Sequence, residues 1–211
     1  MVGKVVNRDD QASGIHFRLR EPNAYLAYRA LPPILARTGA ELAITPCLLG
    51  GLFKLTDNRP PLVAFAGVKG KVEYEKLEIK RFIAKHGLTK FRLNPHFPVN
   101  TLMLMRGLVA ARLRGEEAAY LEMGLQGLWE EGLKLDDKEV LARRAAEAGL
   151  DAARLLEDAQ LPEIKQRLAE TTDAVARRGA FGIPTFFVGE EMFFGKERLA
   201  QVEEELVEMP A

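Results

Sequence analysis

The stretch F-G-I-P-T-F-F-V-G, residues 181–189, decides the fold of this chain. Its second half is a short apolar run rich in aromatic and β-branched residues, which is typical of a buried strand. A proline, Pro184, stands at the entrance to that run. Proline removes one backbone donor from a strand ladder, so its presence there needs a structural reason. Pro184 is therefore either an edge-strand proline or part of a functional site.

The residues that follow complete a hairpin. The run F-F-V-G-E-E-M-F-F-G predicts two short strands joined by a tight G-E-E turn. The next run, K-E-R-L-A-Q-V-E-E-E-L, has the period of a helix. The chain is thus expected to end as strand, strand, helix.

The other end of the chain predicts a strand–helix–strand unit. Residues 14–19 read as a short strand, and Pro22 suits the first turn of a helix, where its missing N–H is not needed. That helix should run to about Arg37 with a kink at the P-P pair, and Gly39 should cap it. The alternating run 41–46 predicts a second strand, parallel to the first.

Between these ends, residues 47–61 look like a loop, and residues from about 70 to 178 have a helical period almost throughout. This order predicts an α/β protein with a thioredoxin-like fold and a large inserted helical domain. We expect residues 1–65 and 179–211 to form the thioredoxin-like domain and residues 66–178 the inserted domain. In such folds the proline of the hairpin is cis. The backbone of Ile183 would then be able to bind an extended peptide, such as the cysteinyl part of glutathione.

Composition excludes several classes of function. The 211 residues hold 30 basic and 30 acidic side chains, so no net field attracts nucleic acid or an anionic membrane. The longest apolar run is too short to cross a bilayer, and the first residues lack the apolar core of a signal peptide, so we expect a cytoplasmic protein. His16, His86 and His96 lack ligand spacing, which predicts no metal. Cys47, the sole cysteine, is expected to be buried, and it excludes a C-x-x-C disulfide oxidoreductase.

From residue 17 to residue 206 the chain resembles 2-hydroxychromene-2-carboxylate isomerases and the related kappa-class glutathione transferases. The motifs that carry this resemblance are P-N-A-Y-L-A, P-C-L-L-G-G-L-F-K-L-T-D-N-R-P-P, N-P-H-F-P-V-N-T-L-M-L-M-R, L-W-E-E-G, E-V-L-A-R-R-A-A-E-A-G-L-D, T-T-D-A-V-A-R-R-G-A-F-G-I-P-T-F-F-V-G and M-F-F-G-K-E-R-L. The resemblance implies an enzyme that uses glutathione on a small, aromatic organic substrate and forms a homodimer. In the isomerase chemistry of the family, a sulfur adds to an electrophilic carbon, a bond rotates, and the sulfur leaves.

The resemblance also implies a set of glutathione-binding positions, which in this chain are Pro22, Asn23, Asn58, Ile183, Pro184, Lys196 and Glu197. Lys196 and Glu197 stand where the family has Ser-Asp or Gln-Asp to hold the γ-glutamyl end. Asn100, Trp129 and Arg18 are the positions implied for the acceptor substrate.

The first strand–helix turn departs from the family pattern. Glu21 stands where the family has a serine that donates a hydrogen bond to the glutathione sulfur, and Arg18 stands where it usually has Asp. An ionised carboxylate about 4 Å from a thiolate repels it by roughly 4 kcal/mol at an effective dielectric constant of about 20. Glu21, if ionised, therefore opposes the usual activation of glutathione.

Three interpretations of Glu21 follow. It is a protonated carboxylic acid that donates a hydrogen bond, an ionised general base, or the mark of a paralogue that has lost the thiol chemistry. The first two predict a glutathione-dependent isomerase or transferase in which Glu21 is catalytic. The third predicts a glutathione-independent or non-catalytic small-molecule-binding protein, in which arginines at the turn hold an anionic ligand.

Overall fold

The computed structural model describes residues 13–17, 19 and 21–208 of the chain. In that part, β1 (Ser13–Phe17) leads into α1 (Pro22–Ala30) and α2 (Pro32–Thr38), and then into β2 (Leu42–Pro46). The predicted long helix is divided at Leu31, directly before the P-P pair, because proline interrupts the helical hydrogen-bond ladder. Gly39 caps α2 at a φ of 71°, as predicted, a conformation that favours glycine.

The sheet has the predicted thioredoxin-like topology, with strand order β2-β1-β3-β4. β1 and β2 are parallel, with Ile15 opposite Ile44. β3 (Thr185–Val188) runs antiparallel to β1 and forms the predicted hairpin with β4 (Glu191–Phe194). A 3-10 turn, η1 (Lys196–Arg198), then leads into the closing helix α11 (Leu199–Glu208).

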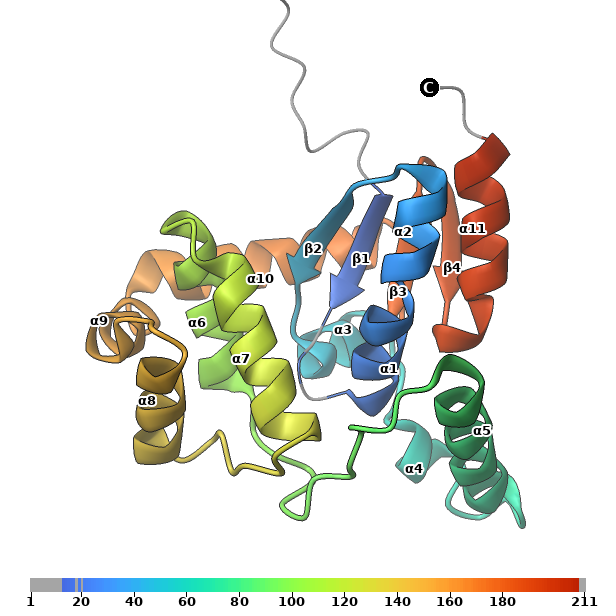
Figure 1. The fold of residues 1–211 in the computed structure, drawn as a ribbon, viewed down its shortest axis with the longest axis horizontal. Helices are drawn as coiled ribbons and strands as arrows, with labels where there is room; N and C mark the ends of the chain where they lie inside the picture. The colour runs from blue at the N-terminus through green and yellow to red at the C-terminus, as the bar shows by residue number, and fades with distance from the viewer. Residues whose placement is uncertain (1–12, 18, 20, 209–211) are drawn as a thin grey trace, which may run out of the picture.

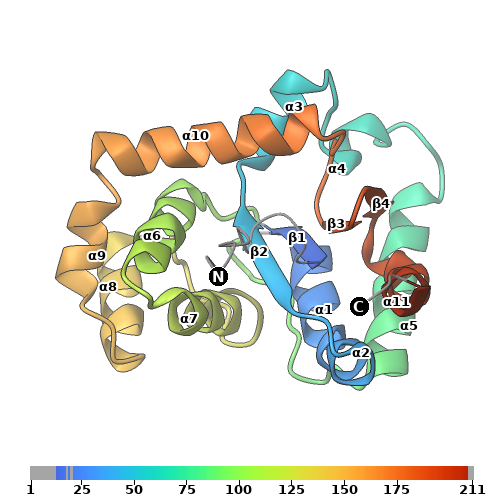
Figure 2. The ribbon, with the colours of Figure 1, turned by 90° about the horizontal axis from the view of Figure 1, so that it is seen from above.

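The helical segment gathers on one side of the sheet. It contains α6 (Leu102–Leu113), α7 (Glu117–Trp129), α8 (Lys138–Glu147), α9 (Ala152–Asp158) and α10 (Pro162–Arg177). Figures 1 and 2 show α6 to α9 as a block beside β2, with α10 leading back toward the hairpin. On the other side of the sheet lie α2, α11 and α5 (Lys71–His86). The division of the chain at residues 65 and 179 stays a prediction.

One segment differs from its prediction. Residues 47–61 were expected to be a loop, but they contain α3 (Leu49–Leu55), and α4 (Pro61–Ala64) begins at their end. Leu49 and Leu52 are buried at helical spacing, and α3 packs on α10. One glycine of the pair that suggests a loop serves that packing, since a Cβ on Gly51 would lie 3.1 Å from Cγ2 of Thr172.

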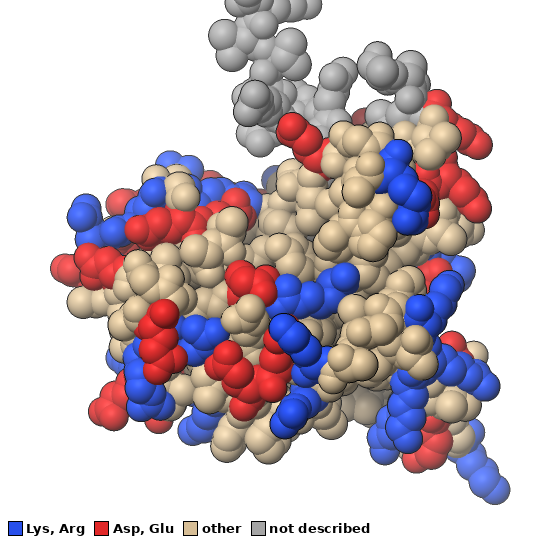
Figure 3. All heavy atoms as spheres, in the orientation of Figure 1, with Lys and Arg blue, Asp and Glu red and all other residues tan. Residues whose placement is uncertain are grey.

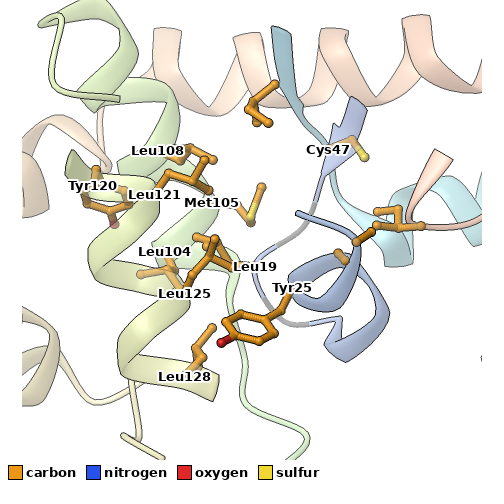
Figure 4. Packing of buried hydrophobic residues seen from close by; sticks show 14 of the residues in the cluster. Leu19, Tyr25, Cys47, Leu104, Met105, Leu108, Tyr120, Leu121, Leu125 and Leu128 are labelled. Carbon is orange, nitrogen blue, oxygen red and sulfur yellow. The ribbon is translucent and has the colours of Figure 1, made fainter. Parts of the chain in front are cut away.

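A single hydrophobic core connects the sheet side to the helical block. Leu19, in the turn that follows β1, is 0% exposed, and Figure 4 shows it with Tyr25 facing the leucines of α6 and α7. Gly124 permits this approach, because a Cβ there would lie 3.1 Å from a Leu19 methyl group. Within the described residues no helix is long and apolar enough to cross a membrane.

Candidate active site

Glu21 occupies the turn between β1 and α1. It is the N-cap residue of α1, with extended backbone angles, and its carbonyl oxygen accepts hydrogen bonds from the N–H groups of Ala24 and Tyr25. Its half-buried side chain does not cap the helix. The carboxylate therefore lies at the positive end of α1, and that end favours its charged form.

Asn23 offers an acceptor at the same turn. Its Oδ1 atom is buried, and within the described residues no hydrogen bond reaches it. Buried side-chain oxygens nearly always have a partner, so an unsatisfied one needs an explanation. An N–H or O–H group of a bound ligand would satisfy it. Pro22, the first residue of α1, holds the turn in the helical conformation that places Asn23 there.

The hairpin proline lies at the same end of the sheet as this turn. The peptide bond between Ile183 and Pro184 is cis, as predicted. His16 of β1 pairs with Thr185 of β3, so the end of β1 and the start of β3 meet at one edge of the sheet. The Pro184 carbonyl accepts a hydrogen bond from the Gly195 N–H at 3.0 Å. This contact brings the start of η1 to the same edge.

Asn58 joins the assembly from the segment between α3 and α4. Its Nδ2 donates to the Phe181 carbonyl at 2.8 Å, and its Oδ1 accepts from the Arg59 N–H at 2.8 Å. Phe181 precedes the cis peptide by two residues. The structure therefore brings Asn58 to the hairpin entrance from more than 120 residues away in the sequence.

Lys196 and Glu197 face a different space. The Lys196 side chain is 1% exposed and forms an ion pair with Glu197, and its Nζ lies 5.4 Å from the centre of the Phe82 ring. Both residues line a cavity of about 460 Å³ between α2, α5 and α11. The two predicted γ-glutamyl positions thus adjoin the hairpin edge but open toward α5.

The residues predicted on the acceptor side are dispersed. Trp129 is 1% exposed, and its indole N–H donates to the Leu19 carbonyl at 2.7 Å, so it supports the backbone of the turn. Asn100 is exposed, and its Oδ1 accepts from the Leu102 N–H at the start of α6. Arg18 lies outside the described residues.

Sequence reasoning missed a charged cluster between α1 and α7. Arg29 donates to Glu122 at 2.8 Å and to Glu130 at 2.7 Å, and the Tyr25 hydroxyl donates to Glu130 at 2.9 Å. Burial and the neighbouring Glu130 raise the pKa of Tyr25 to about 12, although the Arg29 hydrogen bond opposes this. Tyr25 is therefore neutral at physiological pH. The partners are about 100 residues apart, and no local pattern signals such a pairing.

His, Cys, Asp and Glu side chains do not converge on a metal site in the described parts of the chain. Cys47 is 0% exposed, which confirms that it is buried. What the site edge does present is a carboxylate, a buried amide oxygen and a cis-proline strand entrance. This set suits a small polar ligand with an extended backbone.

Comparison with known proteins identifies relatives over most of the chain. A 2-hydroxychromene-2-carboxylate isomerase of Pseudomonas putida is 25% identical over 190 residues, 89% of this chain and 90% of that protein. Glutathione S-transferase kappa 1 of Rattus norvegicus is 26% identical over 198 residues, 88% of this chain and 86% of the relative. These comparisons confirm the resemblance inferred from the motifs, and the relatives are enzymes, which supports the prediction that this chain is one.

Solved structures support the fold. A 2-hydroxychromene-2-carboxylate isomerase structure superimposes with a TM-score of 0.78 at 24% identity and covers 92% of this chain and 93% of its own. The family model described as a DSBA-like thioredoxin domain matches residues 19–207. That match spans almost all of the described residues and agrees with the sheet order and the inserted helices. The chain therefore belongs to the DSBA-like thioredoxin domain family.

Proposed function

We propose that this protein is a glutathione-dependent isomerase or kappa-type transferase that acts on a small aromatic organic substrate. The observation that carries the proposal is the buried, unsatisfied Oδ1 of Asn23 in the turn after β1, at the end of the sheet where β3 begins after the cis Ile183–Pro184 bond, in a chain whose relatives are such enzymes. A peptide-like ligand at this edge supplies the N–H donor that Asn23 lacks. Glutathione is such a peptide and brings a thiol nucleophile.

Each residue of the site has a role in this proposal. Asn23 accepts a hydrogen bond from the ligand, and the backbone of Ile183 binds the cysteinyl part. Glu197, half-exposed beside Lys196, neutralises the ammonium of the γ-glutamyl end. Asn58 fixes the hairpin entrance through its bond to Phe181.

Glu21 is the catalytic residue of the proposal. A carboxylate at the helix N-terminus is held in its charged form, in which it accepts a proton from the thiol or from the substrate. This role differs from that of a hydrogen-bonding serine, since a base removes the proton rather than stabilising the sulfur after its loss. The chain then works with a thiol that is neutral until the substrate is in place.

A second candidate function is favoured by the same residue. Glu21 and the Lys196–Glu197 pair both depart from the family pattern, and both departures affect glutathione contacts. If the carboxylate repels the sulfur instead of activating it, the scaffold binds another small molecule without thiol chemistry.

Calorimetric titration of glutathione into wild type, Glu21→Ser and Glu21→Gln separates the two functions. For the glutathione-dependent enzyme we expect the wild type to bind glutathione. Without substrate, the thiolate absorbance of the wild-type complex should appear only at a higher pH than in the Gln variant, because an ionised Glu21 repels the thiolate. Absence of binding to wild type, with binding gained in the Ser variant, sinks the proposal in favour of the second function. Glu116→Gln, which alters the N-cap residue of α7, is the matched control and should bind like wild type.

A further inference from the structure

The cavity between α2, α5 and α11 extends well beyond the hairpin edge. Its volume of about 460 Å³ is within the range of small-molecule sites, which is roughly 300–1,000 Å³. Ala30, the last residue of α1, lines it, whereas Glu21 precedes the first residue of that helix. A helix of nine residues is about 13 Å long, so the part of the cavity at Ala30 lies at the opposite end of α1 from the turn.

The walls of the cavity combine apolar residues with charged side chains. Pro33, Ile34, Phe82 and Leu199 contribute apolar surface. Arg37 of α2 binds Glu203 of α11 through two hydrogen bonds, of 2.6 and 2.9 Å, and so bridges the two helices that flank the opening. The aromatic or aliphatic part of a ligand would contact the apolar residues, while its polar end would contact the charged side chains.

The charges of the lining favour an anion. Each of its acidic side chains already has a basic partner: Glu203 pairs with Arg37, Glu78 with Arg81, and Glu197 with Lys196. Among the basic residues that line the cavity, Lys85 is the one that forms no ion pair with a described residue. In Figure 3, basic side chains gather over α5, at the lower right of the molecule.

The Lys196–Glu197 pair lines the part of the cavity next to the hairpin edge, and this part is left to the γ-glutamyl end of glutathione. One further group, on α5, fits the chemistry of a second, anionic ligand. His86 stacks on Phe82 at 4.3 Å between ring centres, and burial together with Lys85 lowers the pKa of this imidazole. His86 is therefore neutral at physiological pH and able to hydrogen-bond to a carboxylate or sulfonate.

We propose that this cavity is a second small-molecule site, separate from the Glu21 turn, which binds an organic anion with an apolar body and one carboxylate or sulfonate group. Lys85 and His86 hold the anionic group, and the apolar lining between α2 and α11 holds the body.

The test uses anilinonaphthalene sulfonate, an aromatic sulfonate whose fluorescence rises in apolar sites, and three variants of the full chain. Ala200→Trp fills the cavity from the first turn of α11, and we expect it to weaken probe binding at least tenfold. Lys85→Gln removes the unpaired charge and should weaken binding by about two- to fivefold, as for loss of one exposed ion pair. Lys80→Gln, an exposed lysine of the same helix outside the lining, is the matched control and should bind like wild type.

Competition locates the probe. Saturating glutathione should leave probe binding unchanged, and Glu21→Ser should bind the probe like wild type. Displacement of the probe by glutathione would overturn the separate site, because the cavity would then belong to the thiol site. Unchanged binding by both Ala200→Trp and Lys85→Gln would overturn the proposal as well. The second failure is independent of the calorimetric result at Glu21, because it involves no glutathione.

Discussion

At the scale of single residues, the turn that carries Glu21 depends on a side chain from the far end of α7. Trp129 donates its indole N–H to the Leu19 carbonyl, two residues before Glu21, and packs against Phe91 and Phe97 at ring-centre distances of 5.9 and 6.1 Å. The turn is thus held by the helical block as well as by the sheet.

Replacing Trp129 with Phe should destabilise the protein by about 1–3 kcal/mol, because the buried Leu19 carbonyl loses its donor. Urea unfolding followed by circular dichroism measures this change. Glutathione affinity should fall in the same variant, since the turn loses its support. A variant as stable as wild type would show that the hydrogen bond contributes nothing net.

At Gly107 of α6 the packing of Tyr120 leaves no room for a side chain. A Cβ there would lie 2.0 Å from the Tyr120 hydroxyl and 2.6 Å from the ring, so Gly107→Ala forces α6 and α7 apart. We expect a loss of roughly 1–3 kcal/mol in stability. Gly50→Ala is the matched control: it lies in α3 with open space around it, so alanine should be neutral or slightly stabilising. Equal effects of the two substitutions would contradict this account.

The sequence was informative about residues whose role is local. Pro184 alone left two interpretations open, but the thioredoxin-like order of elements predicted a cis proline there, and the structure has that cis bond. The contact between Arg29 and Glu130 spans 101 residues, so no spacing rule reaches it. The burial of Trp129 and its bond to Leu19 likewise arise from packing of α7 on the turn, which the sequence alone does not determine.

At the scale of elements, a charged cluster joins α1, on the sheet side, to α7 of the helical block. Arg29 binds both Glu122 and Glu130, and its guanidinium also lies 5.1 Å from the centre of the Tyr25 ring. Figure 3 shows acidic and basic side chains together at the lower centre of this face. The cluster fixes one helix on the other.

Stability should depend on pH through Glu122. Burial raises the pKa of this carboxyl, but the hydrogen bond and charge of Arg29 outweigh burial, and the net pKa lies below its ordinary value of 4.5. A lowered native pKa stabilises the fold above about pH 4.5, and this contribution disappears as the pH falls through the native value.

Arg29→Met should therefore be less stable than wild type at neutral pH, and the difference should shrink as the pH falls below 4.5. Unfolding free energies measured by denaturant titration across that range give the comparison. Arg177→Met removes an exposed ion pair with Asp173 on α10 and should change little at any pH. A constant difference between Arg29→Met and wild type over the whole range would refute the role of Glu122.

Helices with a strong hydrophobic period in the sequence were predicted correctly, whereas a helix that depends on tertiary packing was not. α5, α6 and α10 have long helical patterns and lie where expected. α3 contains adjacent glycines, and its helix exists because Leu49 and Leu52 are buried where α3 packs on α10. Tertiary packing overrode a local turn signal there.

At the scale of the whole molecule, the hydrophobic core is one contiguous cluster. It includes Ile44 and Phe187 of the sheet together with Leu108, Leu121 and Leu168 of the helical block. A core shared across the boundary couples the two parts energetically, even though the insertion divides the thioredoxin-like part in the sequence.

We expect the chain to unfold in one cooperative transition. Trp129 is the sole tryptophan and lies at the junction, so its fluorescence reports on contact between the two parts, while circular dichroism reports mainly on the helices. The two signals should give the same midpoint in urea. A fluorescence change that precedes the loss of helix would contradict coupling and support independent domains.

Cys47 follows β2 and is 0% exposed. A thiol-reactive dye therefore labels the native chain only as fast as this region opens, and the labelling rate measures the rate at which the core opens. The same shielding keeps glutathione from forming a mixed disulfide with the folded chain. In a solution of the native protein, every sulfur that reacts promptly with such a dye belongs to the added thiol.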